Sequence, residues 1–378
     1  MGGISQDDVR YSDDVELDGS AEGVGRQRRR GGAVLFEDDG PIEVFGQQDR
    51  LPLTSRGHRN GSLPPAPGHT PVLLSEMLAA LDVRSRGIYL DATFGSGGYA
   101  RAILRAGAGL VYAIDRDPAA AARGRELAAT CSRFRMLEGR FGEMAELLRA
   151  HGVRQVDGIV LDLGVSSMQL DDPDRGFSFA ADGPLDMRMS GEGPTAADVV
   201  NGADVDTLTG ILRRYGEEPA ARRIARAIVG RRQRRPFERT RELAQLVAEV
   251  VGGRPGRTDP ATRTFQALRI HLNDELGELE RALPAAEALL APGGRLVVVA
   301  FHSLEDRIVK RFLAEGSDAR PHPSRHVPMP VATATVPSWR LLARRAIRPE
   351  PSEVAANPRA RSARLRWAER ASGPEPAP

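Results

Sequence analysis

Residues 88–100, with the sequence IYLDATFGSGGYA, decide the fold of this chain. An apolar run typical of a strand leads directly into Gly95, Gly97 and Gly98, and a helical pattern, YARAILRA, follows them. Glycine lets the backbone turn sharply and approach a ligand closely, because a Cβ would occupy that space. A strand, a glycine loop and a helix in this order indicate a nucleotide-type binding site.

An acidic residue stands where such a site needs one. Asp115 ends the next apolar run, in YAIDRDP, twenty residues beyond Gly95. A carboxylate there can accept both hydroxyl hydrogens of a ribose, which fits an adenosine-containing cofactor. GSGGYA also matches G-x-G-x-x-A, so an oxidoreductase with a nicotinamide or flavin dinucleotide stays open at this point. The plain alternative is a tight turn without a ligand, in which Asp91 is a turn residue.

Short apolar runs alternate with helical patterns along the chain. The predicted strands are GIYLDATF (87–94), GLVYAID (109–115), FRMLEGRF (134–141) and VDGIVLDLG (156–164). This alternation predicts an α/β, Rossmann-like fold with a mostly parallel sheet. The fifth strand, GRLVVVAFHS (294–303), comes about 130 residues later, which exceeds any ordinary crossover and predicts an insertion. A last edge strand is expected in RSARLRWAER (361–370).

The inserted segment has helical periodicity. PAARRIARAIVGRR (219–232) and LAQLVAEVV (243–251) carry apolar residues at helix spacing, and a leucine stripe from Leu268 to Leu283 predicts a helix returning to the sheet. HTPVLLSEMLAAL (69–81) predicts an amphipathic helix with Thr70 as its cap and Pro71 at its first position. The expected domains are a disordered extension (1–67), a discontinuous catalytic domain (68–170 and 273–371), an inserted helical domain (171–272) and a flexible tail (372–378).

Composition and charge limit the functional classes. With 41 % hydrophobic and 28 % charged residues, the 378-residue chain has ordinary globular composition. Its net charge of +2 hides a basic region, because residues 208–257 hold 13 Arg against 5 Glu. Such a region predicts a polyanionic partner. Cys131 is the single cysteine, which excludes an internal disulfide and favours a cytoplasmic protein, and we expect neither a membrane span nor a signal peptide.

Polar side chains follow the fourth strand, in LDLGVSSMQLDD. Asp162, Ser166, Ser167 and Gln169 should lie at the carboxyl edge of the sheet, where ligands bind in such folds. Helix capping is the alternative role for the serines. Nearby aspartates at 171, 172 and 174 fit a solvated acidic loop better than a metal site, so no metal is expected. A hydrolase built on His302 and Ser303 is excluded because no G-x-S-x-G motif exposes a nucleophile.

Long motifs between about residues 68 and 371 resemble the ribosomal small subunit methyltransferase H (MraW) family. They are GHTPVLLSEML, DATFGSGG, AIDRDP, GIVLDLGVSSMQLDDPDRGFSF, GPLDMRM, RTFQALRIHLNDEL, APGGRLVVVAFHSLEDRIVKRF and NPRARSARLRWAER. The resemblance implies a class I methyltransferase that uses S-adenosyl-L-methionine to methylate N4 of a cytidine in the decoding region of 16S ribosomal RNA. The implied partner is that RNA within the small subunit, with a homodimer as a further option.

The resemblance also implies site residues. The implied cofactor contacts are Gly97, Gly98, Tyr99, Asp115, Phe141, Asp162 and Gln169. Asp115 suits the ribose, Phe141 offers an apolar face to adenine, and Asp162 can orient the amino-acid end or face the target amine. Tyr99 replaces the family's usual histidine, so a backbone contact is retained and an imidazole role is lost.

Catalysis needs an acceptor for an N–H of the cytosine amine. We expect Asp162, helped by Ser166 or Ser167, to supply it. The inserted helices carry Arg222, Arg223, Arg226, Arg231 and Arg232, which can bind phosphates or can simply form a solvated helix face. A non-catalytic RNA-binding assembly factor is the second rival function, beside the oxidoreductase.

Overall fold

The structure is a computed structural model that describes residues 71–252, 259–317 and 337–372. The predicted extension at 1–67 and nearly all of the predicted tail at 372–378 lie outside these ranges. None of the helices within the described ranges has the length and apolar character needed to cross a bilayer.

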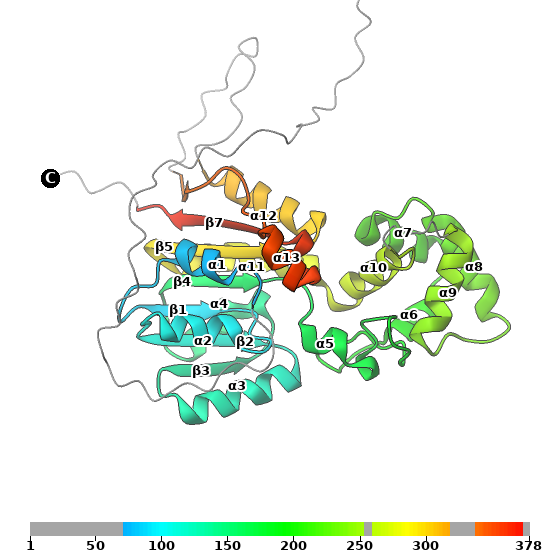
Figure 1. Cartoon of the computed structure of the whole chain (residues 1–378), viewed down its shortest axis with the longest axis horizontal. Coiled ribbons are helices and arrows are strands. Elements are labelled where there is room, and N and C mark those ends of the chain that lie inside the picture. Colours follow the sequence, from blue (N-terminus) through cyan, green and yellow to red (C-terminus); the bar gives the residue numbers. More distant parts are fainter. Residues whose placement is uncertain (1–70, 253–258, 318–336, 373–378) are drawn as a thin grey trace, which may run out of the picture. The chain divides into compact units, whose positions relative to one another are not determined.

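A seven-stranded sheet forms the centre of the fold, with strand order β3-β2-β1-β4-β5-β7-β6 (Figure 1). Neighbouring strands from β3 to β5 pair in parallel, whereas β7 is antiparallel to both β5 and β6. The strands are β1 (Ile88–Asp91), β2 (Leu110–Asp115), β3 (Phe134–Glu138), β4 (Val156–Asp162), β5 (Leu290–Ala300), β6 (Trp339–Leu341) and β7 (Arg364–Arg370). The expected α/β fold with a mostly parallel sheet is confirmed. Strands β2 and β3 lie on one side of β1, and β4 and β5 lie on the other. The order in which successive strands are placed thus changes direction between β1 and β4, and such sheets bind ligands at this position.

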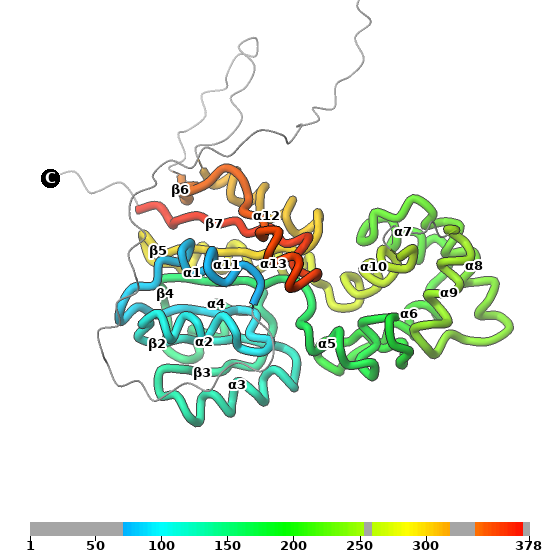
Figure 2. The backbone as a smooth tube through the Cα atoms, viewed as in Figure 1, coloured from blue at the N-terminus to red at the C-terminus, as the bar shows by residue number. Residues whose placement is uncertain are grey.

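Helices cover both faces of the sheet (Figures 1 and 2). Alternate residues of β2 show this, because Val111 packs with one apolar cluster and Ile114 with the other. The first cluster contains α1 (Leu74–Leu81), α2 (Gly98–Arg105) and α3 (Pro118–Thr130). The second contains α4 (Met144–Ala150), α11 (Glu275–Leu289) and α12 (Ser303–Glu315). Shorter elements are η1 (Phe141–Glu143), η2 (Pro173–Arg175), α13 (Pro351–Ala356) and η3 (Pro358–Ser362).

The segment between β4 and β5 is helical. Its helices are α5 (Ser167–Asp171), α6 (Ala196–Gly202), α7 (Val205–Gly216), α8 (Ala221–Arg232), α9 (Thr240–Val251) and α10 (Thr262–Asn273). A third apolar cluster, which includes Leu212, Ile224 and Phe265, gives these helices a core of their own. Figure 2 shows the chain leaving the sheet after β4 and returning through α10 and α11. The boundaries at residues 171 and 272 stay predictions.

The first helix begins later than its local signals predict. Helix α1 starts at Leu74, so the placement of Pro71 at the first helical position is wrong, and Thr70 lies outside the described residues. Leu73 adopts a left-handed conformation with φ of 53°, and its N–H donates to Glu353 Oε1 at 2.8 Å. A Cβ on Gly98 would lie 2.2 Å from Pro71 Cγ, so Pro71 packs against the glycine loop. Tertiary contacts therefore override the local helix-start signal.

Three further boundaries differ from prediction. The leucine stripe is split between α10 and α11, because Asp274 has φ of 50° and interrupts the helix. Strand β5 ends at Ala300, and His302 caps α12, so the predicted strand end at 303 is wrong. The predicted edge strand is β7, but β6 lies outside it, because the short run Trp339–Leu341 pairs with β7. Three residues are too few for period-2 alternation to identify a strand.

Candidate functional site

The glycine loop is shaped by a buried acid and by close packing. Asp91 is fully buried, and its carboxylate accepts hydrogen bonds from the N–H groups of Thr93 (3.3 Å) and Ala100 (3.0 Å). Burial raises the pKa of Asp91 to about 7. Gly97 has φ of +80°, and a Cβ there would lie 2.6 Å from Phe94 Cζ. Asp91 is thus more than a turn residue, because it joins the end of β1 to the start of α2.

Asp115 lies at the end of β2, directly beside this loop. Its Oδ2 accepts the N–H of Gly95 at 2.8 Å, and its Oδ1 accepts the N–H of Asp117 at 2.9 Å. Burial raises the pKa of Asp115. A carboxylate oxygen has about two acceptor positions, so each oxygen can accept one further hydrogen bond. The carboxylate is therefore fixed in place and able to bind two hydroxyl groups of a ribose.

Asp162 is the least satisfied acid of the site. Its backbone N–H donates to Thr93 Oγ1 at 2.7 Å, which ties the end of β4 to the glycine loop. Its Oδ1 is buried and has no hydrogen-bond partner among the described residues. Burial, reinforced by the charges of Asp91 and Glu305, raises the pKa of Asp162 to about 8. An unpaired buried polar atom costs about 1–3 kcal/mol, and a perturbed carboxyl in such a position is typical of a functional site.

The serines after β4 have different roles. Ser166 caps α5, because its Oγ accepts the N–H of Gln169 (3.3 Å) while Gln169 Oε1 accepts the N–H of Ser166 (2.9 Å). Its Cβ also lies 3.7 Å from the point that a Cβ on Gly95 would occupy, so α5 begins beside the glycine loop. The hydroxyl of Ser167 makes no hydrogen bond within the part of the chain that the structure describes. Capping thus accounts for Ser166 and leaves Ser167 available.

Phe141 and Tyr99 face different environments. Phe141 lines a cavity of about 30 Å³ together with Arg116, Gly164 and Glu305. The Tyr99 side chain, only 3 % exposed, belongs to the core, and its hydroxyl donates to the carbonyl oxygen of Val72. The Tyr99 side chain is therefore occupied within the core, and the predicted backbone contact with a cofactor stays a prediction.

Sequence reasoning missed a polar network that joins this edge to the insertion. Asp117 Oδ2 accepts from Gln169 Nε2 (2.8 Å) and from Arg175 Nη1 (2.9 Å). Arg175 Nη2 also donates to the carbonyl of Met189 at 3.0 Å. The arginine stands 58 residues from Asp117, so the spacing in the sequence gave no signal for the pair.

Asn273 makes a second connection of this kind. Its Oδ1 accepts from Arg116 Nη2 and from the Met189 N–H, both at 2.9 Å, and its Nδ2 donates to the Met187 carbonyl at 2.8 Å. Asn273 is 1 % exposed and lies at the break between α10 and α11. The insertion is thus fixed to the end of β2 through one buried amide.

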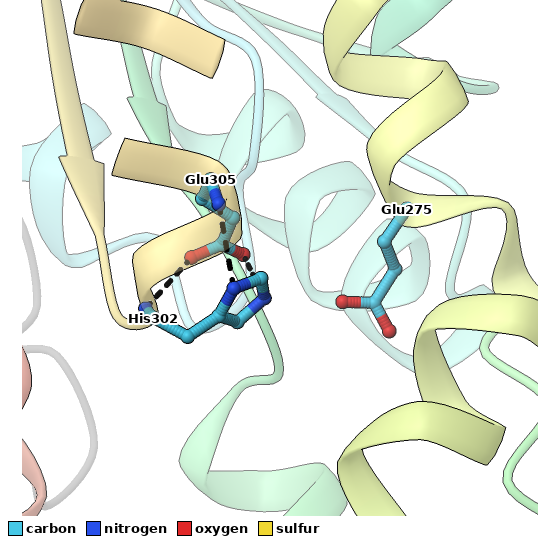
Figure 3. A group of neighbouring side chains, drawn as sticks. All are labelled: Glu275, His302 and Glu305. Carbon is cyan, nitrogen blue, oxygen red and sulfur yellow. Dashed lines mark hydrogen bonds and ion pairs between the residues drawn. The ribbon is translucent and has the colours of Figure 1, made fainter. Parts of the chain in front are cut away.

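Figure 3 shows a group with the composition of a metal site, at the starts of α11 and α12. Ligand atoms of Glu275, His302 and Glu305 all lie within 4.8 Å of one another. Glu275 is held by Arg269 through two contacts of 2.8 Å, and Glu305 Oε1 lies 3.1 Å from His302 Nε2. Glu305 Oε2 accepts the N–H groups of residues 301 and 302. Arg269 and the backbone N–H groups thus already occupy at least one acceptor position on each of three oxygens, namely both oxygens of Glu275 and Oε2 of Glu305.

The carboxylates of the predicted acidic loop, Asp171 and Asp172, also have partners within the protein. Asp171 pairs with Arg359, and Asp172 caps η2 by accepting the Asp174 N–H at 3.0 Å. These exposed carboxylates therefore serve capping and ion pairing, as in a solvated loop.

The arginines of α8 divide into two groups. Arg231 stacks on Phe237 at 4.3 Å, and Arg232 donates to the carbonyls of Val200 and Ala203, so both hold the insertion together. Arg222 pairs with Asp206 at 3.2 Å. Arg223 and Arg226 are exposed and have no ion pair or hydrogen bond from their side chains within the described ranges. Arg223 and Arg226 thus leave positive charge on one face of α8, where a polyanion can bind.

Comparisons with known proteins agree with the motifs. The sequence model of the MraW methylase family matches residues 66–371. A relative named ribosomal RNA small subunit methyltransferase H from Paramagnetospirillum magneticum is 61 % identical over 307 residues, which cover 81 % of this chain and 96 % of the relative. One of the same name from Caulobacter vibrioides is 56 % identical, with 81 % and 96 % covered. Among solved structures, a putative rRNA methylase from Clostridium thermocellum is 13 % identical with a TM-score of 0.37, covering 79 % of this chain and 98 % of that one.

Proposed function

The chain belongs to the MraW methylase family, and we propose that it methylates N4 of a cytidine in the decoding region of 16S ribosomal RNA. The methyl donor is S-adenosylmethionine, and a ribosomal RNA substrate supports our proposal that the protein acts in the cytoplasm. The observation that carries the proposed chemistry is Asp162 at the sheet edge beside the glycine loop, because its buried Oδ1 has no hydrogen-bond partner among the residues that the structure describes.

The residues present fit the donor. Asp115 has acceptor capacity for both ribose hydroxyls, and its own position is fixed by two backbone N–H groups. Phe141 offers a ring to adenine at the end of the neighbouring strand. In the proposed site, the backbone of Gly97, Gly98 and Tyr99 contacts the donor, and Gln169 and Asp162 border its amino-acid end. When bound, the donor supplies an electrophilic methyl group on a sulfonium.

Asp162 meets the needs of the acceptor amine. The lone pair of a cytosine amine is delocalised into the ring, so an N–H acceptor is required to orient it for attack. Methylation of this nitrogen requires one N–H proton to leave it. We assign this proton to the Asp162 carboxylate, because a pKa near the working pH suits a general base. Ser167, with a hydroxyl that has no partner in the described chain, is placed to assist.

In this proposal, the helical insertion between β4 and β5 binds the RNA. A cytidine in structured RNA must be unstacked before it can reach a pocket, which costs a few kcal/mol. Arg222, Arg223 and Arg226 project from α8 and can bind phosphates. The proposed division assigns methyl transfer to residues 68–170 and 273–371 and target binding to residues 171–272.

Transfer of tritium from labelled donor to small subunits that lack the modification tests this function. We expect label in the 16S RNA and N4-methylcytidine on nucleoside analysis. Label on another base or position would refute the assigned specificity, and tight RNA binding without transfer would indicate an assembly factor. Calorimetry with S-adenosylmethionine and with a nicotinamide dinucleotide tests the oxidoreductase alternative separately.

A further inference from the structure

An open groove of about 390 Å³ lies beside the candidate site. Its walls come from α10, from the turn between β5 and α12, and from the segment that leads into β7. The lining includes Gln266, His302, Ser303, Arg348, Arg361 and Arg364, and no carboxylate is among its lining residues. A concave surface with three guanidinium groups is suited to an anion.

The backbone that carries these arginines is well fixed. Ile347 and Leu365 exchange both backbone hydrogen bonds at 2.9 Å, which places Arg348 and Arg364 on neighbouring segments. Asp306 accepts from Arg364 Nη1 at 2.9 Å and from Arg366 Nε at 2.6 Å. The single negative charge of Asp306 is thus shared by Arg364 and Arg366, so these three side chains together carry a net positive charge.

Arg361 is the arginine most open to a ligand. It lies in η3, is exposed, and makes no side-chain hydrogen bond or ion pair with any residue of the described ranges. The turn before it is held by Asn357, whose Oδ1 accepts the N–H of Arg359 at 3.2 Å. A fixed turn therefore presents Arg361, which has no side-chain partner in the described part of the chain.

The groove and the cavity beside Phe141 meet at one pair of side chains. His302 lines the groove, Glu305 lines the cavity, and their side chains are 3.1 Å apart. Gly164, which also lines the cavity, follows Asp162 by two residues. The groove is thus linked through the His302–Glu305 pair to the cavity that reaches the residues just after β4.

We propose that this groove binds the phosphodiester backbone of the single-stranded RNA adjacent to the target nucleotide, with Arg361 and Arg348 on phosphate oxygens. The inference rests on the proposed function. Arginine presents a planar set of donors that matches phosphate. Gln266 and Ser303 also line the groove. Gln266 Nε2 donates to the Tyr215 carbonyl and Ser303 Oγ donates to Glu217, so each side chain offers its oxygen as an acceptor for ribose hydroxyls, which distinguish RNA. The surface is separate from the arginines of α8 and positions the strand at the site itself.

Binding of a 16S RNA fragment that contains the target, measured by fluorescence anisotropy at several salt concentrations, tests the inference. We expect R348A/R361A to weaken RNA binding about tenfold and to reduce the slope of log K against log salt by about 0.7 per lost phosphate contact. R361E should weaken binding further, and R361K should keep most of it. The matched control is R149A, because Arg149 is equally exposed but ends α4, which leads into the amino edge of β4.

Donor affinity and the unfolding midpoint should be unchanged in every variant, which shows that the fold and the cofactor site are intact. A wild-type salt slope and Kd in R348A/R361A would overturn the inference. Weaker binding to assembled subunits with unchanged binding to the naked fragment would also overturn it, since the groove would then contact a ribosomal protein. Failure of the proposed function is distinguishable, because wild-type protein would then transfer no methyl group whatever the groove does.

Discussion

Replacing Asp162 by asparagine should stabilise the protein and abolish its activity. The side chain keeps its size, but the ionisable group is removed from a site where burial and the charges of Asp91 and Glu305 raise its pKa to about 8 from 3.8. A carboxyl with a raised folded pKa binds its proton more tightly in the native state. The free energy of unfolding of the wild type is therefore highest, as far as Asp162 is concerned, below the pKa of the unfolded state, and it decreases as the pH rises toward 8.

The size of this stabilisation follows from the difference between the folded and unfolded pKa of Asp162. One pKa unit corresponds to about 1.4 kcal/mol, so at pH 7 the native state bears a cost of at most about 4 kcal/mol. Partial contact with solvent reduces the expected gain of Asp162→Asn to about 2 kcal/mol at pH 7. At pH 4, close to the unfolded pKa of 3.8, a large share of the unfolded wild type also holds the proton, and the gain should fall below about 1 kcal/mol.

Denaturant unfolding of the wild type and of Asp162→Asn at pH 4, 5.5 and 7 measures the gain in free energy of unfolding. Tritium transfer from labelled donor measures turnover. Loss of a general base lowers turnover about 100- to 10,000-fold. Asp174→Asn is the control, because that aspartate is exposed in the neighbouring loop and should change neither quantity. A gain that does not depend on pH would refute the buried-charge argument. Normal turnover with intact donor affinity would refute the role of Asp162 in catalysis.

Asp115→Ala should weaken S-adenosylmethionine binding at least about tenfold in calorimetry, since it removes a charged acceptor for two hydroxyls, and undiminished binding would contradict the ribose assignment. Gly98→Ala places a Cβ 2.2 Å from Pro71 Cγ and should lower the free energy of unfolding by about 1–3 kcal/mol. R223E/R226E should weaken RNA binding and flatten its salt dependence without changing donor affinity, in contrast to R149E. At low donor concentration, kcat/KM should rise with pH to a midpoint at about 8 and then level off, because Asp162 must be ionised to accept a proton.

The parallel core and much of its ligand edge were predictable from the sequence. Runs such as VDGIVLD are buried and followed at once by polar residues, and the carboxyl ends of parallel strands meet at one edge of a sheet. Gly97, Asp115 and Asp162 are therefore placed together without any knowledge of tertiary contacts. The capping role of Ser166 is likewise a local pattern, because Gln169 follows it by three residues.

The errors lie where distant contacts decide local conformation. The spacing from Leu268 to Leu283 is continuous, yet the helix breaks at Asp274, next to an asparagine bonded to Arg116, 157 residues away. The left-handed turn at Leu73 depends on Glu353, 280 residues away. Helical periodicity reports which residues face a core, but it contains no information about such partners.

The site of the insertion explains how one sheet edge can serve both a cofactor and a large RNA. The chain leaves the sheet just after Asp162 and returns through α10 and α11 to β5. Asn273, at the end of α10, is bonded to Arg116 directly after β2, so both junctions lie at the carboxyl edge. Arg175 and Asn273 fix the insertion to this edge through partly buried hydrogen bonds to Asp117 and Arg116. Because these bonds end one or two residues from Asp115, the position of the insertion is linked to the end of β2, where we propose that the ribose binds.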